Sequence, residues 1–201
     1  KNGENRSAAY YHAINRGKRS VLADFTKKED IDLVVTLIKE ADVVIENYKV
    51  GDLKKYGLDY ESVRKIHPNI IYCSVTGFGQ TGPYAHRPGY DLIIQAMGGI
   101  MDITGEPDRE PMRTGVAYAD VFTGCYSAIA IQAALIARAK TGEGQHIDMS
   151  LMDVQTSVLA NQALNYLVSG KAPRRMGNAH PNVVPYQAFE TSDGYMIIAV
   201  G

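Results

Sequence analysis

One carboxylate stands out because of the residues that surround it. Residues 115–124 read GVAYADVFTG, a run of small and apolar residues whose single acid is Asp120. The run comes before an apolar stretch, residues 125–139, that we expect to form a helix. Asp120 therefore has two interpretations. It is either a helix N-cap that accepts a first-turn N–H, or a nucleophile in a water-poor pocket beside a helix start, whose N–H groups stabilise developing charge.

The histidines and cysteines, which often bind metals or act as catalytic groups, form no recognisable motif in this chain. The five histidines form no i, i+4 pair and have no cysteine at metal-ligand spacing, so we expect no metal site. Cys125 falls inside the expected helix and is interpreted as a small buried hydrophobe, although a Cys–His nucleophile pair stays open. The sequence contains neither a G-x-S-x-G elbow nor a P-loop pattern.

A glycine pattern at residues 77–82, GFGQTG, matches the dinucleotide motif G-x-G-x-x-G after an expected strand. Pro83 and further loop-type residues stand where the helix of that motif should begin, so no helix N-terminus is offered to a pyrophosphate. We therefore expect no NAD cofactor. The glycines are interpreted as a loop that approaches a ligand or another backbone closely.

The elements that must position Asp120 follow a β-α-β order. Strands are expected at residues 20–25, 42–46, 69–76 and 146–151, and helices at 26–41, 60–67, 90–101, 125–139 and 153–168, with Thr26 and Asp153 as caps. This order predicts an α/β fold with a parallel sheet and crossover helices. Asn47 directly follows a strand, where such sheets bind ligands. The basic turn at residues 15–20 is either solvated or an anion site.

A domain boundary is expected near residue 170, because residues 169–175 have linker composition. Residues 1–170 would then be part of a large domain, and residues 171–201 the linker and the start of a smaller α+β domain with strands at 183–189 and 195–200. The chain begins without Met and stops inside an expected strand, so we expect a segment of a longer protein.

Composition restricts the partners. The 201 residues are 45% hydrophobic and 21% charged, which is typical of a globular protein. A net charge of −1 gives no reason to expect a nucleic acid or a membrane surface as partner. Two cysteines in apolar segments favour buried thiols in a reducing compartment, although a disulfide between Cys73 and Cys125 stays open. We find no run that we judge long enough to span a membrane. We expect the cytoplasm, or the mitochondrial matrix for a eukaryotic protein.

Taken together, the motifs resemble the CaiB/BaiF group, the class III CoA-transferases, which includes formyl-CoA:oxalate CoA-transferase. The resemblance covers essentially the whole chain. It is carried by residues 15–20 (NRGKRS), 42–51, 76–83 (TGFGQTGP), 89–91 (GYD), Asp120 with Thr123 and Gly124, and 141–145 (TGEGQ).

The resemblance implies a catalytic role for Asp120. In this family the aspartate attacks the donor acyl-CoA thioester, giving a mixed anhydride and CoA thiolate, and the thiolate then forms an aspartyl-CoA thioester that an acceptor carboxylate resolves. A carboxylate suits this chemistry, and a water-poor pocket limits hydrolysis of the anhydride. Coenzyme A would enter only as acyl-CoA substrate.

The resemblance also implies a CoA site, a Rossmann-like large domain and an interlocked homodimer for the full-length protein. The CoA-binding residues would be Ala23, Asp24, Phe25, Thr26, Asn47, Tyr48, Lys49 and Lys55, with Pro88, Gly89, Tyr90 and Asp91 along the pantetheine arm and the active site. Lysines at two of these positions suit the phosphates.

Tyr90 distinguishes two activities within the family. The racemases that epimerise 2-methylacyl-CoA carry a histidine at this position, which works with the aspartate as a two-base pair. Tyrosine is a poor base near neutral pH because its ordinary pKa is about 10. Transfer is therefore favoured over epimerisation, and a CoA-binding subunit without chemistry is the third hypothesis.

The loop at residues 177–182 bears on the acceptor. It contains fewer glycines than the loop that covers the aspartate in the formyl-CoA enzyme, and residues 177–187 look more like family members that act on dicarboxylates such as glutarate or succinate. We therefore expect a dicarboxylic acceptor, whose distal carboxylate would meet His180, Asn182 or Arg175.

Overall fold

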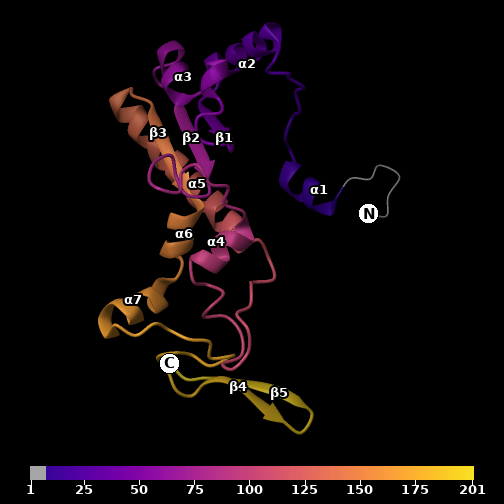
Figure 1. Ribbon diagram of the computed structural model, residues 1–201, viewed down its shortest axis with the longest axis vertical. Helices are drawn as coiled ribbons and strands as arrows, with labels where there is room; N and C mark the ends of the chain where they lie inside the picture. The colour runs from indigo at the N-terminus through magenta and orange to yellow at the C-terminus, as the bar shows by residue number, and fades with distance from the viewer. Residues whose placement is uncertain (1–7) are drawn as a thin grey trace. The chain divides into compact units, whose positions relative to one another are not determined.

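The computed structural model describes residues 8–201 (Figure 1). The chain divides into two compact units, Lys1–Leu37 and Ile38–Gly201, and each is described by itself. In the first unit, α1 (Ala9–Asn15) is followed by an irregular segment that leads to α2 (Lys28–Glu40), whose last residues, from Ile38 on, are counted in the second unit. The strand expected at residues 20–25 does not form. Among the described residues no strand pairs with this segment, and Leu22 is 95% exposed.

The start of α2 corrects the expected cap. Thr26 lies in a turn, and the Asp24 carboxylate accepts both its N–H (3.0 Å) and its hydroxyl (2.7 Å). The Asp30 carboxylate in turn accepts the N–H of Asp24 at 2.8 Å. These two carboxylates therefore hold the turn that leads into α2, because the N–H groups that they accept belong to Asp24 and Thr26, which precede the helix.

The second unit contains the parallel sheet that the sequence predicts. Strands β1 (Val43–Glu46), β2 (Ile71–Thr76) and β3 (Gln145–Ser150) lie side by side in that order (Figure 1). The short 3-10 helix η1 (Lys54–Tyr56) and α3 (Tyr60–Ile66) connect β1 to β2. The central strand β2 is almost entirely buried, as expected for a parallel sheet covered on both faces.

Alternate side chains of β2 face different layers. Cys73 is completely buried in a cluster with Met149 and Val154, against which Phe122 and Ile131 of the long helix α5 pack. On the other side, the Ser74 hydroxyl lies 3.0 Å from His146 Nε2, and the His146 ring stacks on Tyr60 of α3 with 4.5 Å between centroids. The sheet is thus held between α3 and α5.

Helix α5 (Tyr118–Thr141) starts earlier than expected, at residue 118 and not at 125. Near its end, the Arg138 guanidinium bonds the Asp42 carboxylate (2.6 Å) and the Asn69 carbonyl (3.1 Å), which come just before β1 and β2. Gly142, at φ 76°, closes the helix by donating its N–H to the Arg138 carbonyl. The helix therefore runs against the strand direction, and its N-terminus lies at their carboxyl ends.

Two sequence expectations about α5 need correction. The helix has 24 residues, and an 18-residue window of it has a mean hydropathy of 1.4, so that it would suffice by length and composition to cross a membrane. It packs against β2, β3, α4 and α6, and 22% of that window is buried inside the structure. Cys125 on this helix is exposed and not buried, because it lies on the face turned away from the sheet contacts, whereas Cys73 is buried and both thiols are free.

The remaining elements largely follow expectation. Helix α4 (Asp91–Met97) is shorter than expected, and in place of one helix at 153–168 the chain forms α6 (Leu151–Ser157) and α7 (Ala160–Ser169). Ser150, and not Asp153, caps α6, because the Ser150 hydroxyl accepts the Asp153 N–H at 3.2 Å. Strands β4 (Tyr186–Thr191) and β5 (Gly194–Ala199) pair antiparallel, as the turn between them predicts.

Candidate active site

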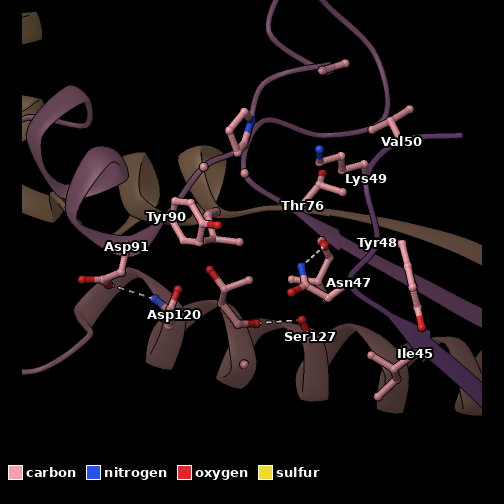
Figure 2. Close-up of a pocket in the computed structure, with 18 of the residues that line it drawn as sticks. Ile45, Asn47, Tyr48, Lys49, Val50, Thr76, Tyr90, Asp91, Asp120 and Ser127 are labelled. Atoms are coloured by element: carbon pink, nitrogen blue, oxygen red, sulfur yellow. Dashed lines mark hydrogen bonds between the residues drawn. The ribbon is translucent and has the colours of Figure 1, made fainter. Parts of the chain in front are cut away.

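A cavity of about 860 Å³ opens at the carboxyl ends of β1 and β2, within the range typical of ligand pockets. Its walls are the ends of these strands, the loop before α4, one face of α5 and Leu151. The lining residues are Ile45, Asn47, Tyr48, Lys49, Val50, Val75, Thr76, Gly77, Ala85, His86, Arg87, Pro88, Gly89, Tyr90, Asp91, Asp120, Thr123, Gly124, Ser127, Ala128, Ile131, Gln132 and Leu151. Figure 2 shows Asn47, Thr76, Tyr90 and Asp120 around the same space.

Most sequence-predicted site residues of the second unit therefore meet at one cavity. Asn47, Tyr48 and Lys49 come from the loop after β1, and Pro88 to Asp91 from the entry to α4. The Asn47 side-chain amide donates to the Val75 carbonyl, which fixes the first loop against the end of β2 (Figure 2). The Tyr48 N–H donates to Glu46 at 2.8 Å.

Asp120 is not the N-cap of its helix. It is the third residue of α5. Ala117 occupies the N-cap position, and its methyl side chain cannot accept a hydrogen bond from the helix. The cap comes from another helix. The Asp91 Oδ1 accepts the N–H of Ala119 at 2.8 Å. It also accepts the N–H of Asp120 at 3.3 Å (Figure 2). These two N–H groups are therefore occupied, which corrects the expectation that the helix-start N–H groups stabilise developing charge.

The surroundings make Asp120 a stronger base than an ordinary aspartate. Burial raises the pKa of its carboxyl group, and the nearby negative charge of Asp91 raises it further. A carboxylate of higher pKa is more nucleophilic, since its charge is less stabilised by the surroundings. The environment therefore fits the nucleophile interpretation of Asp120 better than the cap interpretation.

The sequence analysis named Thr123 only as part of a motif, and it did not predict that a face of α5 next to Asp120 lines the site. Thr123 and Ser127 line the cavity at helical spacing from Asp120, and their hydroxyls donate back to the Ala119 and Thr123 carbonyls, both at 2.7 Å. Because both hydroxyl hydrogens are used within the helix, these side chains present a wall of small groups to the cavity. Residues 120, 123 and 127 follow the i, i+3, i+7 spacing of one helix face, but this spacing indicates a shared face only if the helix begins by residue 118 and not at 125.

Two further basic residues line the cavity, and the sequence analysis had not singled them out. His86 and Arg87 lie in the loop that follows the glycine pattern, and the Arg87 guanidinium stacks on the Tyr84 ring at 4.4 Å. Lys49 and Arg87 add positive charge to a cavity that also has apolar walls. Such a cavity suits an elongated ligand with an anionic end and a less polar arm.

Some predicted CoA residues lie elsewhere. Lys55 does not line the cavity, and its ammonium group lies 4.8 Å from the centroid of the Tyr56 ring. Ala23, Asp24, Phe25 and Thr26 belong to the first unit, where the two hydrogen bonds from Thr26 lower the pKa of the Asp24 carboxyl. Their contact with a ligand stays a prediction.

The three residues expected at the acceptor carboxylate have partners of their own. Arg175 donates to the Asp102 carboxylate (2.7 Å) and carbonyl (3.0 Å). His180 Nδ1 accepts the N–H groups of Asn182 and Val183, and the Asn182 amide bonds Asn165 of α7. None of the three lines the cavity that contains Asp120. In this arrangement they fix the segment between α7 and β4, and an acceptor contact stays a prediction.

Within residues 8–201, no group of three or more His, Cys, Asp or Glu side chains is arranged to hold a metal ion. The cavity therefore offers carboxylate, amide, hydroxyl and cationic groups. Those groups can bind an anionic ligand and present one activated carboxylate to it.

The comparisons with known proteins agree with this site. Residues 1–201 match the family described as CoA-transferase family III. Over 199 residues the chain is 64% identical to the succinate–glutarate CoA-transferase of Agrobacterium fabrum, covering 99% of this chain and 50% of that protein. It is 44% identical to the human succinyl-CoA:glutarate CoA-transferase, covering 96% of this chain and 44% of that protein.

A solved structure shows the same fold. The crystal structure of a CaiB/BaiF family protein from Brucella suis superposes with a TM-score of 0.91 at 69% identity, covering 97% of this chain and 52% of that one. The chain thus spans about half the length of the relatives that it matches.

Proposed function

The chain belongs to CoA-transferase family III, and we propose that it transfers CoA from an acyl-CoA donor to a small dicarboxylic acid, with Asp120 as the nucleophile. The observation that carries the proposal is the position of Asp120, whose carboxyl of raised pKa lines a cavity that also contains the cationic side chains of Lys49 and Arg87. Relatives named for succinate and glutarate support the class of acid.

The reaction proceeds through two exchanges at Asp120. A carboxylate oxygen of Asp120 attacks the thioester carbonyl, the C–S bond breaks, and a mixed anhydride and CoA thiolate result. The thiolate attacks the Asp120 carbonyl and releases the donor acid, which leaves an aspartyl-CoA thioester. The acceptor carboxylate then attacks this thioester and the thiolate returns to the acceptor acyl group, which regenerates the Asp120 carboxylate.

The cavity residues take complementary parts in the proposal. Lys49, His86 and Arg87 bind the phosphates, since charge-assisted hydrogen bonds to phosphate are strong. The wall of Thr123 and Ser127 accommodates the pantetheine arm, and Tyr90 covers the reacting thioester. We include in the proposal a smaller domain that starts near residue 171 and an interlocked homodimer of the full-length protein.

Trapping the intermediate tests this function. Full-length protein is incubated with succinyl-CoA and glutarate, treated with hydroxylamine during turnover, digested and analysed by mass spectrometry. We expect glutaryl-CoA to form and a hydroxamate at Asp120, because hydroxylamine attacks the activated aspartyl carbonyl. Transfer to no dicarboxylate across a panel of acyl-CoA donors, with no adduct at Asp120, would contradict the proposal. Binding of CoA without an adduct would instead indicate a non-catalytic subunit.

One observation keeps epimerisation as a second candidate. His86 lines the same cavity as Asp120, so a histidine and a carboxylate could act as two bases although Tyr90 stands where the racemases carry histidine. Epimerisation predicts solvent deuterium at the α-carbon of a 2-methylacyl-CoA. Transfer without such exchange excludes it.

Lys49 and Lys55 provide a matched test of the CoA site. We expect Lys49→Ala to weaken CoA binding about 5- to 10-fold, because it removes one charge-assisted contact to phosphate. Lys55→Ala should leave the affinity within about twofold, since Lys55 lies outside the cavity. Isothermal titration of the full-length variants with CoA measures both. Equal losses would show that the phosphates do not lie at Lys49.

A further inference from the structure

Behind the cavity lies a buried amide that links three segments. Gln95 of α4 is completely buried, and every hydrogen-bonding group of its side chain has a partner. Its Nε2 donates to the Asp91 Oδ2 at 2.7 Å and to the Val116 carbonyl at 3.5 Å. Its Oε1 accepts from the Thr114 N–H at 3.0 Å. The Thr114 hydroxyl lies 3.3 Å from Oε1 and donates to the Val116 carbonyl at 2.9 Å.

We propose that Gln95 is a positioning residue that orients Asp91 and, through Asp91, the first turn of α5 that carries Asp120. The Thr114 N–H determines which end of the amide faces which partner, because a backbone N–H can only donate. The amide oxygen must therefore face Thr114, and the NH₂ group must face Asp91. With one carboxylate oxygen held by Gln95, the other is directed at the N–H groups of Ala119 and Asp120.

This link matters because the segment before α5 has no regular structure that could place the helix. Residues 106–117 contain no helix or strand, and Ala117 provides no side-chain cap. Gln95 ties this segment to α4 through Thr114 and Val116, and Asp91 ties the helix start to the same turn of α4. Displacing Asp91 would move the backbone of Asp120 and also reduce the negative charge beside its carboxyl.

The charged and titratable groups around Asp120 come from three segments. Tyr48 and Lys49 lie in the loop after β1, His86, Arg87 and Tyr90 in the loop before α4, and Asp91 at the start of α4. Of these groups, Asp91 is the one whose charge raises the pKa of Asp120. A change at Gln95 should therefore act on Asp120 through Asp91.

Three variants of the full-length protein test the inference, which rests on the proposed function. Gln95→Met removes the hydrogen bonds at similar volume, and we expect kcat to fall about 10-fold or more at every pH with KM for acyl-CoA within about twofold, because a misplaced nucleophile is costly. Gln95→Glu keeps the shape but places two carboxyl groups together, which must share a proton. We expect it to be active at low pH and to lose activity as pH rises.

The matched control is Gln155→Met. Gln155 of α6 is equally buried, but its amide atoms have no hydrogen-bond partner among the described residues. This variant should retain the kcat and pH profile of the unmodified protein. A merely structural role of Gln95 would lower stability in both Gln95 variants without adding a pH-dependent limb to the activity of Gln95→Glu.

A readout independent of activity separates this inference from the proposed function. Water-soluble carbodiimide modifies protonated carboxyl groups, so the pH midpoint of labelling at Asp120, followed by mass spectrometry, reports its protonation. We expect the midpoint to shift to lower pH in Gln95→Met, because the Asp91 charge is no longer held beside Asp120. An unchanged midpoint together with unchanged kcat would overturn the inference. If the unmodified protein catalyses no transfer, the proposed function fails and the midpoint alone decides the role of Gln95.

Discussion

Asp120→Asn is expected to abolish CoA transfer and, in the same protein, to increase stability at neutral pH. The amide has nearly the shape of the carboxyl but cannot attack a thioester, so kcat should fall at least about 10⁴-fold, as for other nucleophile replacements. Chromatographic detection of glutaryl-CoA formed from succinyl-CoA measures the loss. Activity within about tenfold of the unmodified protein would show that Asp120 is not the nucleophile.

The stability effect follows from the raised pKa of Asp120. Because the folded state binds this proton more tightly than the unfolded state does, the carboxyl contributes least to stability above its folded pKa. The unmodified protein therefore loses stability as pH rises from the ordinary value of 3.8 through that pKa, and the variant does not. Urea unfolding at several pH values should show the variant to be more stable near pH 7, with the difference vanishing at low pH.

Asp153→Asn is the matched control for both effects. Asp153 also lies in the first turn of a helix, but it does not line the cavity that contains Asp120, and its helix is capped by Ser150. Its replacement should leave transfer unchanged and should not raise stability at pH 7. A gain of stability equal to that of Asp120→Asn would indicate a general helix effect and not the release of a destabilised carboxylate.

Gly77→Ala should have the largest effect on stability. Gly77 and Gly89 cross so closely that a Cβ on Gly77 would overlap the backbone of Gly89. Backbone atoms cannot move aside as a flexible side chain does, so we expect a loss of about 3 kcal/mol in the free energy of unfolding. Because Gly89 precedes Tyr90 and Asp91, the displaced backbone should also lower kcat. Urea unfolding and the transfer assay measure the two effects.

Gly115→Ala distinguishes crowding from the mere loss of a glycine. Gly115 is not in the left-handed region, and an added Cβ would meet nothing within 4 Å. Its replacement should leave the free energy of unfolding within about 0.5 kcal/mol of that of the unmodified protein. A slight increase is also consistent, because alanine restricts the unfolded chain more than glycine does. If both variants lost stability equally, the close crossing at Gly77 would not be the cause.

Local sequence patterns predicted much of the fold. Residues 42–46 and 69–76 were expected to be buried strands of a parallel sheet, and β1, β2 and β3 pair in parallel. The failed dinucleotide motif was also interpreted correctly as loop, since no helix follows Gly82. These predictions succeeded because runs of β-branched residues, proline and glycine act on the chain within a few residues.

Expectations that depend on distant partners were less accurate. Residues 20–25 have the composition of a strand but pair with no strand among the described residues, and Cys125 lies in an apolar run yet is exposed. Arg175, His180 and Asn182 were chosen for their chemistry, and their contact with an acceptor stays a prediction. In the structure Arg175 is bonded to Asp102, and His180 and Asn182 are bonded to residues of their own loop and of α7. Composition cannot show which polar groups are already occupied.

The sequence by itself determined that Asp120 is the one acid in its segment, beside a helix and among loops at strand ends. The tertiary structure alone decided how that acid is held. Asp120 is not the N-cap of α5, because the helix already begins at Tyr118. The N–H of Asp120 is instead accepted by Asp91, which lies 29 positions earlier in the chain. A cap from another helix leaves no local pattern, since it depends on where α4 packs against α5. The same packing places the Asp91 charge that raises the pKa of Asp120.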